Sequence, residues 1–172
     1  MILSVSRRTD IPAFYMPWFM NRLREGYVMV RNPMNYHQVS RVSLSPEVID
    51  CMVFWTKNAI PLTPHLGEIA LQYPFYIQYT LNPYGRDLEP GLPPLAQRLA
   101  SACAIAEQFG SKHVVWRYDP IMLTEQYTAD WHIEQFAAMA DALKGSARDC
   151  VFSFVDLYDK VQALSLIHIS EP

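Results

Sequence analysis

The feature that most constrains the fold of this chain is a repeated order of side chains, in which a short apolar run ends in charged or amide residues. Leu3 and Val5 alternate with serines, the period of two expected of a β-strand. This run leads into Arg7, Arg8 and Asp10, and the pattern returns five times, ending at Arg31-Asn32-Pro33, Thr56-Lys57-Asn58, Thr80-Leu81-Asn82-Pro83, Arg117-Tyr118-Asp119-Pro120 and Asp156. If these six strands are parallel, their polar ends meet at one edge of a sheet.

Helical patterns separate the predicted strands. Pro17 suits the first turn of a helix that ends at Gly26, and the spacing from Leu95 to Phe109 predicts another. Thr63-Pro64 begins a third helix, and Thr128 caps a fourth, whose inner stripe is predicted to be Ile133, Phe136, Ala137, Ala140 and Leu143. Strands that alternate with helices indicate a parallel sheet.

Three segments depart from this alternation. After the second strand (residues 27–31), turn residues lead into a second alternating run over residues 38–44, which predicts a β-hairpin insertion. Ser45-Pro46 predicts a short helix before the strand at residues 51–55. The loop over residues 82–94 is rich in proline and glycine, and its length is typical of a functional lid or a disordered bridge.

A sheet of such apolar strands must be covered on both faces, either as a closed barrel or as a doubly wound open sheet. Neither a G-x-G-x-x-G motif nor a P-loop follows the first strand, and the polar residues Ser4, Ser6, Gln78 and Ser153 fit a barrel interior. We therefore predict an α/β fold, a parallel (β/α) barrel of the TIM type over residues 1–163, incomplete because closure takes two more strands. Residues 164–172 abandon the helical pattern and are expected to be a non-native tail.

Composition limits the classes of protein. With 51% apolar residues the chain must bury a core, yet it has neither an apolar run long enough for a bilayer nor a signal-peptide pattern, so we expect a cytoplasmic protein without membrane partners. The net charge of −3 excludes nucleic-acid binding through overall positive charge. Cys51, Cys103 and Cys150 form no C-x-x-C pair, so we expect neither a disulfide framework nor a metal site in this chain. Open barrel edges favour self-association.

The candidate site is the shared polar edge. Several cations that face one opening suit a phosphate or carboxylate ligand, although they could instead form structural bridges with neighbouring aspartates. Amide and hydroxyl side chains there either orient a polar ligand or cap turns, and Gln78, in mid-strand, is the stronger ligand candidate. The predicted site residues are Arg7, Arg8, Asp10, Arg31, Lys57, Asn58, Gln78, Thr80, Arg117, Asp119 and Asp156.

Other polar and aromatic residues have simpler interpretations. A turn role explains Asn32 and Asn82, because each precedes a proline. The strand aromatics Trp55, Trp116, Tyr79 and Tyr118 either stack on a base or lie in the core. The histidines are not at ligand spacing and are expected at the surface or at helix caps: His37, His65, His113, His132 and His168.

Six stretches of the sequence together resemble the bacterial family called domain of unknown function 1848: residues 4–15, 30–33, 38–46, 53–58, 115–120 and 153–158. Members of this family are similar in architecture to radical-SAM barrels, and they continue to a C-terminal cluster that looks like a C-x-x-x-C-x-x-C iron–sulfur site. The resemblance implies a 4Fe-4S cluster and S-adenosylmethionine in a full-length parent, and no cofactor in this chain, which lacks those cysteines. It implies no known reaction.

Three interpretations of the chain remain open at this point. The chain is the barrel part of a radical-SAM-like enzyme that acts on an anionic, nucleotide or nucleic-acid substrate, or a non-catalytic barrel that binds such a ligand, or an inert truncated fragment. Clustered cysteines encoded beyond residue 163 would favour the first.

Overall fold

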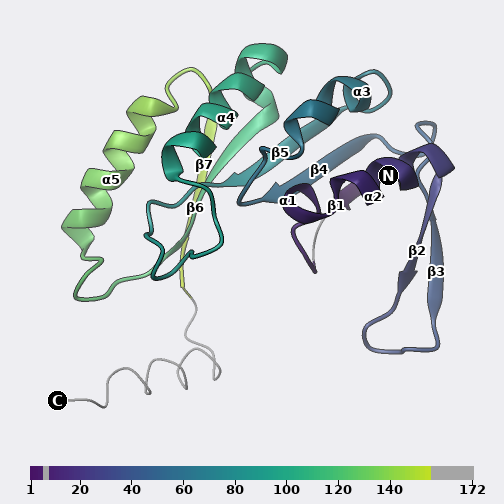
Figure 1. Ribbon diagram of the computed structural model, residues 1–172, viewed down its shortest axis with the longest axis horizontal. Helices are drawn as coiled ribbons and strands as arrows, with labels where there is room; N and C mark the ends of the chain where they lie inside the picture. Colours follow the sequence, from purple (N-terminus) through teal and green to yellow (C-terminus); the bar gives the residue numbers. More distant parts are fainter. Residues whose placement is uncertain (6–7, 156–172) are drawn as a thin grey trace.

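The computed structural model describes residues 1–5 and 8–155 of the chain. Five strands form a parallel sheet in the order β1 (Ile2–Val5), β4 (Cys51–Thr56), β5 (Phe75–Thr80), β6 (Val114–Ile121) and β7 (Asp149–Phe154) (Figure 1). Each pair of neighbours is parallel, so all five carboxyl ends lie at one edge. In the described part of the chain the first and last of these strands are not paired with each other, as the sequence predicts, and they leave two sheet edges.

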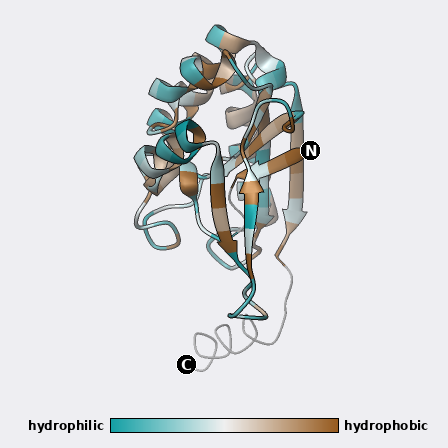
Figure 2. Cartoon of the chain, turned by 90° about the vertical axis from the view of Figure 1, so that its right-hand side faces the viewer, coloured by the Kyte–Doolittle hydropathy of each residue, from teal (hydrophilic) through white to brown (hydrophobic). Residues whose placement is uncertain are grey.

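The described α-helices lie on one face of this sheet (Figures 1 and 2). They are α1 (Ile11–Phe14), α2 (Met16–Glu25), α3 (Leu66–Ala70), α4 (Leu95–Phe109) and α5 (Ala129–Ala142), with short 3-10 turns at Thr63–His65 and Ser111–His113. Alternation along the strands follows from this one-sided covering. In β5, Phe75, Ile77 and Tyr79 are buried under helices, whereas Tyr76, Gln78 and Thr80 face the helix-free side and are half-buried.

The predicted hairpin is present as β2 (Tyr27–Arg31) and β3 (Val39–Ser43), which pair antiparallel in a separate two-stranded sheet. The prediction that residues 27–31 form a strand of the parallel sheet is therefore wrong, and the described parallel sheet has five strands. The physical reason is the side-chain pattern: only Val28 and Val30 make an apolar face, and the opposite face carries Arg31. A central parallel strand needs two apolar faces.

Two other expectations are corrected. The segment after Ser45-Pro46 is a single turn, in which the Val48 N–H donates to the Ser45 carbonyl at 3.1 Å. The turn does not continue as a helix, because the Asp50 N–H donates to the Met1 carbonyl at 2.9 Å beside β1. The stripe of α5 also differs. Ile133 is 67% exposed, and the buried positions are His132 and Met139.

His132 is therefore a core residue rather than a surface one. Its Nδ1 accepts from the Tyr118 hydroxyl at 2.8 Å, and its Nε2 bonds the Met122 carbonyl at 2.9 Å. Burial, and then the nearby Tyr84, raise the pKa of Tyr118, so its hydroxyl keeps its proton for this bond. Both ring nitrogens are satisfied, which is how an imidazole is buried at low cost.

Of the four strand aromatics, Tyr79, Trp116 and Tyr118 lie in the core beneath the helices. Trp116 stacks on Phe136 with ring centroids 4.8 Å apart, and its indole N–H donates to the Leu81 carbonyl at 3.0 Å. Trp55 is on the other face. Among the described residues, none of the helices combines the length and apolar character that a bilayer span takes.

Candidate functional site

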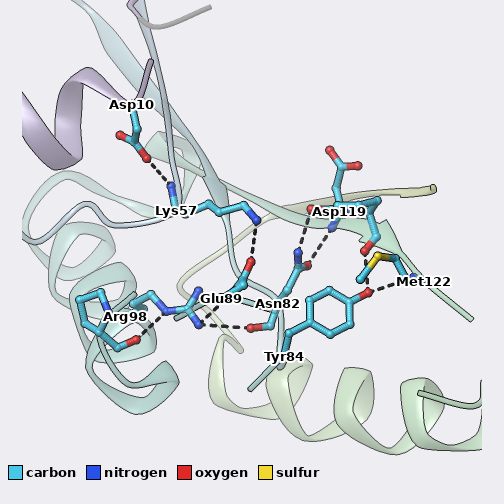
Figure 3. Close-up of polar contacts among 10 residues, drawn as sticks. Asp10, Lys57, Asn82, Tyr84, Glu89, Arg98, Asp119 and Met122 are labelled. Carbon is cyan, nitrogen blue, oxygen red and sulfur yellow. Dashed lines mark hydrogen bonds and ion pairs between the residues drawn. The ribbon is translucent and has the colours of Figure 1, made fainter. Parts of the chain in front are cut away.

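Asp10 links the start of α1 to the end of β4 at the carboxyl edge of the sheet. One carboxylate oxygen accepts from the Ala13 N–H at 2.9 Å and caps α1. The other accepts from the Thr56 hydroxyl and from the Lys57 N–H, each at 2.9 Å (Figure 3). Three donors thus fix this carboxylate, which positions the start of the loop after β4.

The loop over residues 82–94 packs against the same edge through an ion network in which Glu89 and Arg98 are buried (Figure 3). Glu89 Oε1 accepts from Lys57 Nζ at 2.6 Å, and Glu89 Oε2 lies 3.6 Å from Arg98 Nη2. Arg98 is 2% exposed, and Glu89 is 9% exposed. Burial lowers the pKa of Arg98, and the negative charge of Glu89 opposes this effect. The loop is therefore anchored at its centre by charge, and it is not a disordered bridge.

The sequence did carry a signal for Arg98. Counted along α4, it falls three residues after Leu95 and four before Ala102, so a cation occupies the apolar stripe of an amphipathic helix. A buried guanidinium requires a nearby acid. Glu89 itself had no such signal, since it lies in a loop without periodicity.

The Asn82 side chain connects the end of β5 to β6 with the two hydrogen bonds that a neighbouring strand would otherwise make. Its Nδ2 donates to the Asp119 carbonyl at 2.8 Å, and its Oδ1 accepts from the Asp119 N–H at 3.0 Å (Figure 3). Two residues on, the Tyr84 hydroxyl donates to the Pro120 carbonyl at 2.7 Å and accepts from the Met122 N–H at 3.0 Å. The interpretation of Asn82 as only a turn residue is thus too narrow, because its side chain replaces a missing stretch of ladder.

Arg117 and its neighbours form a polar cluster on the helix-free face. Asp119 Oδ2 accepts from Arg117 Nε at 3.1 Å and from Nη2 at 2.5 Å. Gln78 Oε1 accepts from Arg117 Nη1 at 3.4 Å, and the guanidinium lies over the Trp55 ring, 5.1 Å from its centroid. The Ser153 hydroxyl donates to Asp119 Oδ1. This set, Trp55, Gln78, Arg117, Asp119 and Ser153, is called the Arg117 cluster below.

Asp119 is ionised in this cluster. Burial raises the pKa of its carboxyl, but hydrogen bonds from Ser153 and Arg117 and the charges of Arg117 and Lys57 lower it, and the net pKa is below its ordinary value. A folded-state pKa below the unfolded value contributes stability that is complete above the unfolded pKa and is lost as the pH falls through the folded one.

An Asp119→Asn variant is therefore expected to unfold more easily than the parent at pH 7, by about 2 kcal/mol, and the difference should shrink below about pH 4. Urea titrations at both pH values, followed by circular dichroism, would measure it. A difference that is equal at the two pH values would show that the charge of Asp119 does not stabilise the fold.

The remaining predicted residues do not all join these contacts. Arg8 and Arg31 lie together near the hairpin: Arg8 Nη1 donates to the Arg31 carbonyl at 2.8 Å, and Arg31 Nη1 donates to the Tyr36 carbonyl at 2.5 Å. Asn58 accepts from the Ile60 N–H at 3.2 Å, a turn-capping bond. Thr80 is half-buried beside Arg117 in the register of β5 and β6. Arg7 and Asp156 lie outside the described residues.

Lys57 and Arg117 are thus each paired with a carboxylate, the arrangement that a structural bridge also has. The cation excess that we predicted for this edge is reduced by Glu89, which the sequence did not indicate. An anionic ligand at this edge must therefore bind N–H donors of Lys57 or Arg117 that are not already bonded to Glu89 or Asp119.

The cysteines do not gather at this edge. Cys51 is in β4, Cys103 is in α4, where its Sγ lies 3.6 Å from the Ala142 carbonyl, and Cys150 is in β7. Burial raises the pKa of the Cys51 and Cys150 thiols, which disfavours the thiolate that a metal binds. In the described ranges no three His, Cys, Asp or Glu side chains are grouped so that they could hold a metal ion. These residues do not fit an iron–sulfur cluster.

Comparison with curated proteins and with solved structures gives no match. Residues 2–171 match the family described as domain of unknown function (DUF1848), which is almost the whole chain. The matched range contains Asp10, Lys57, Arg117 and Asp119. The chain belongs to the DUF1848 family.

Proposed function

We propose that this chain is part of a (β/α) barrel enzyme that binds an anionic, nucleotide-like substrate at the carboxyl edge of its sheet. The observation that carries the proposal is the one-sided winding: the parallel strands β1, β4, β5, β6 and β7 follow chain order, and the larger helices cover a single face. A doubly wound sheet reverses its strand order and places helices on both faces. Barrels build their sites at the carboxyl ends of their strands.

The Arg117 cluster is the part of this edge best suited to a substrate. It lies on the helix-free side, which corresponds to the interior of a barrel. Asp119 holds Arg117 through Nε and Nη2, and Nη1 keeps only a long contact of 3.4 Å with Gln78. Nη1 is therefore the donor that an incoming phosphate or carboxylate would use, and the Gln78 amide could turn to offer a second donor.

We further propose that the full-length parent protein carries a 4Fe-4S cluster and uses S-adenosylmethionine. The support is the family resemblance, which implies a C-terminal cysteine cluster after the six matching stretches. The described cysteines do not fit such a cluster, so the described residues are assigned no part in holding it. Anaerobic purification of a longer native protein, followed by iron analysis, would test this part separately.

The test of the substrate site is Arg117→Met, titrated calorimetrically with S-adenosylmethionine, nucleotides and a short oligonucleotide. We expect a ligand that binds the protein with Arg117 to bind the Arg117→Met variant more weakly by about 1.5–3 kcal/mol, the cost of one hydrogen bond to a charged group. Arg148→Met is the matched control, because Arg148 is exposed and precedes β7 at the opposite edge. If both variants bind every ligand as the parent does, the Arg117 cluster is structural.

A further inference from the structure

A pocket lies between the loop over residues 82–94 and the start of α4. Its volume is about 240 Å³, and its lining includes Tyr84, Arg86, Glu89, Pro94, Leu95 and Arg98. It is distinct from the Arg117 cluster, because α4 covers the other face of the sheet (Figure 1). None of the residues in this lining was predicted as a site residue.

Arg98 brings an unused donor to this pocket. Its Nε donates to the Pro93 carbonyl at 3.1 Å, and its Nη2 donates to the Asn82 carbonyl at 3.3 Å. Its Nη1 has no hydrogen-bond partner among the described residues. Water cannot replace the missing partner, because Nη1 is buried and the side chain is only 2% exposed. A buried charged donor without an acceptor is costly, so its presence requires an explanation.

Glu89 brings an unused acceptor to the same pocket. Its Oε1 is occupied by Lys57, whereas its Oε2 is buried without a hydrogen-bond partner in the described part of the chain, 3.6 Å from Arg98 Nη2. Two residues of the lining therefore carry a donor and an acceptor that are buried and have no hydrogen-bond partner among the described residues, and two cations, Arg98 and Lys57, surround the one carboxylate.

The amino end of α4 adds a third contribution. This helix has 15 residues, its N-cap is Pro94, and no side chain caps its first turn. Pro94 has no N–H, and the N–H groups of Gln97 and Arg98 donate to the Pro94 carbonyl at 3.0 and 3.3 Å. The Leu95 N–H and the positive end of the helix dipole are what this end of α4 offers to an anion in the pocket.

From these three observations we propose that the pocket binds a protonated phosphate, either inorganic phosphate or the monoanion of a phosphate monoester. Phosphate oxygens would accept from Arg98 Nη1 and from the Leu95 N–H, and the P–OH would donate to Glu89 Oε2. This last bond makes the site selective. Sulfate has a similar shape but carries no proton at neutral pH, so it would place an oxygen lone pair against the Glu89 carboxylate.

The experiment is a titration of the full chain with inorganic phosphate and, separately, with sulfate at matched ionic strength, by calorimetry and by ³¹P NMR line width for phosphate. We expect phosphate to bind at least about tenfold more tightly than sulfate, because one charge-assisted hydrogen bond distinguishes them. Equal binding of the two anions, or binding of neither, would overturn the proposal. The ratio of the sulfate dissociation constant to the phosphate dissociation constant, measured on the unaltered chain, therefore tests the phosphate site without any variant.

Glu89→Gln sharpens the test, because glutamine has the same shape and can offer an amide donor in place of the carboxylate. In a variant shown to be folded by circular dichroism, the phosphate-to-sulfate ratio should fall to about one. Arg86→Met is the control: Arg86 is an exposed cation of the same lining, so its loss should weaken both anions and leave the ratio unchanged. An unchanged ratio in folded Glu89→Gln would contradict the role of Oε2.

The two proposed sites can be separated in the same assays. Arg117→Met should leave the binding of inorganic phosphate intact, and Glu89→Gln should leave the nucleotide-like ligand of the Arg117 cluster bound. If the phosphate and sulfate titrations contradict the pocket beside α4, the proposal for the Arg117 cluster still stands. The reverse also holds for the titrations with nucleotide-like ligands.

Discussion

Replacement of Glu89 by leucine is expected to lower the free energy of unfolding by about 3–5 kcal/mol, the cost of removing one partner from a buried ion pair. Arg98 would keep its charge at 2% exposure, with only two carbonyl acceptors. Lys57 would lose the same partner at lower cost, because its side chain is 43% exposed and can turn to water. Urea unfolding at neutral pH, followed by circular dichroism, would measure the change.

Two comparisons identify the cause. Glu68→Leu removes the acid of a surface pair, Arg24 with Glu68 at 3.3 Å, and should cost less than about 1 kcal/mol. In the double variant Glu89→Leu/Arg98→Met the buried charge is also gone, so most of the lost stability should return. If the double variant is less stable than Glu89→Leu, the buried charge of Arg98 is not what destabilises the single variant.

The sequence predicts the strands of this fold well because their signal is local. An apolar run that ends at Lys57 or at Arg117 can be recognised without knowing its neighbours, and its end predicts the edge at which those side chains lie. The hairpin was predicted for the same reason. What the pattern left open was whether residues 27–31 join the parallel sheet, because that depends on which strand pairs with them.

The polar contacts were predicted less completely. Asp10, Asp119 and their strand ends were identified, but Glu89 and Arg98 were not, although they make the most buried ion pair of the described residues. Their pairing depends on how a loop of 13 residues folds back over α4, and no local pattern encodes that path. His132 was misplaced for a related reason: its burial needs the hydroxyl of Tyr118, which comes from another element.

Glu89 also illustrates why the carboxyl edge is a reasonable place for function. Buried ion pairs are often no more stabilising than apolar residues of the same size. A network of Lys57, Glu89 and Arg98 that leaves one donor and one acceptor unused is therefore poorly explained by stability alone. Binding of a phosphate would give Arg98 Nη1 and Glu89 Oε2 the partners that the described residues do not provide. The Glu89→Leu variant measures a different quantity, the change in the free energy of unfolding when Arg98 loses its acidic partner.

Asn82→Ala is the second variant with a large expected effect, a loss of about 2–4 kcal/mol in the free energy of unfolding. The side chain is 1% exposed and satisfies both backbone groups of Asp119, the carbonyl at 2.8 Å and the N–H at 3.0 Å. Alanine would leave both groups without a partner, and each unsatisfied buried group costs about 1–3 kcal/mol.

The matched control for this variant is Asn58→Ala, which removes one turn-capping bond of 3.2 Å at a half-buried site that water can reach. It should cost less than about 1 kcal/mol. Asn82→Asp separates the two bonds of Asn82, since the introduced carboxylate still accepts from the Asp119 N–H but cannot donate to its carbonyl, and it adds a negative charge near Asp119. We expect its stability at neutral pH to be no better than that of Asn82→Ala, and to improve relative to it in acid, where the introduced carboxyl group is protonated and can donate. Equal stability of Asn82→Ala and Asn58→Ala in urea unfolding would mean that the link between β5 and β6 does not depend on the Asn82 side chain.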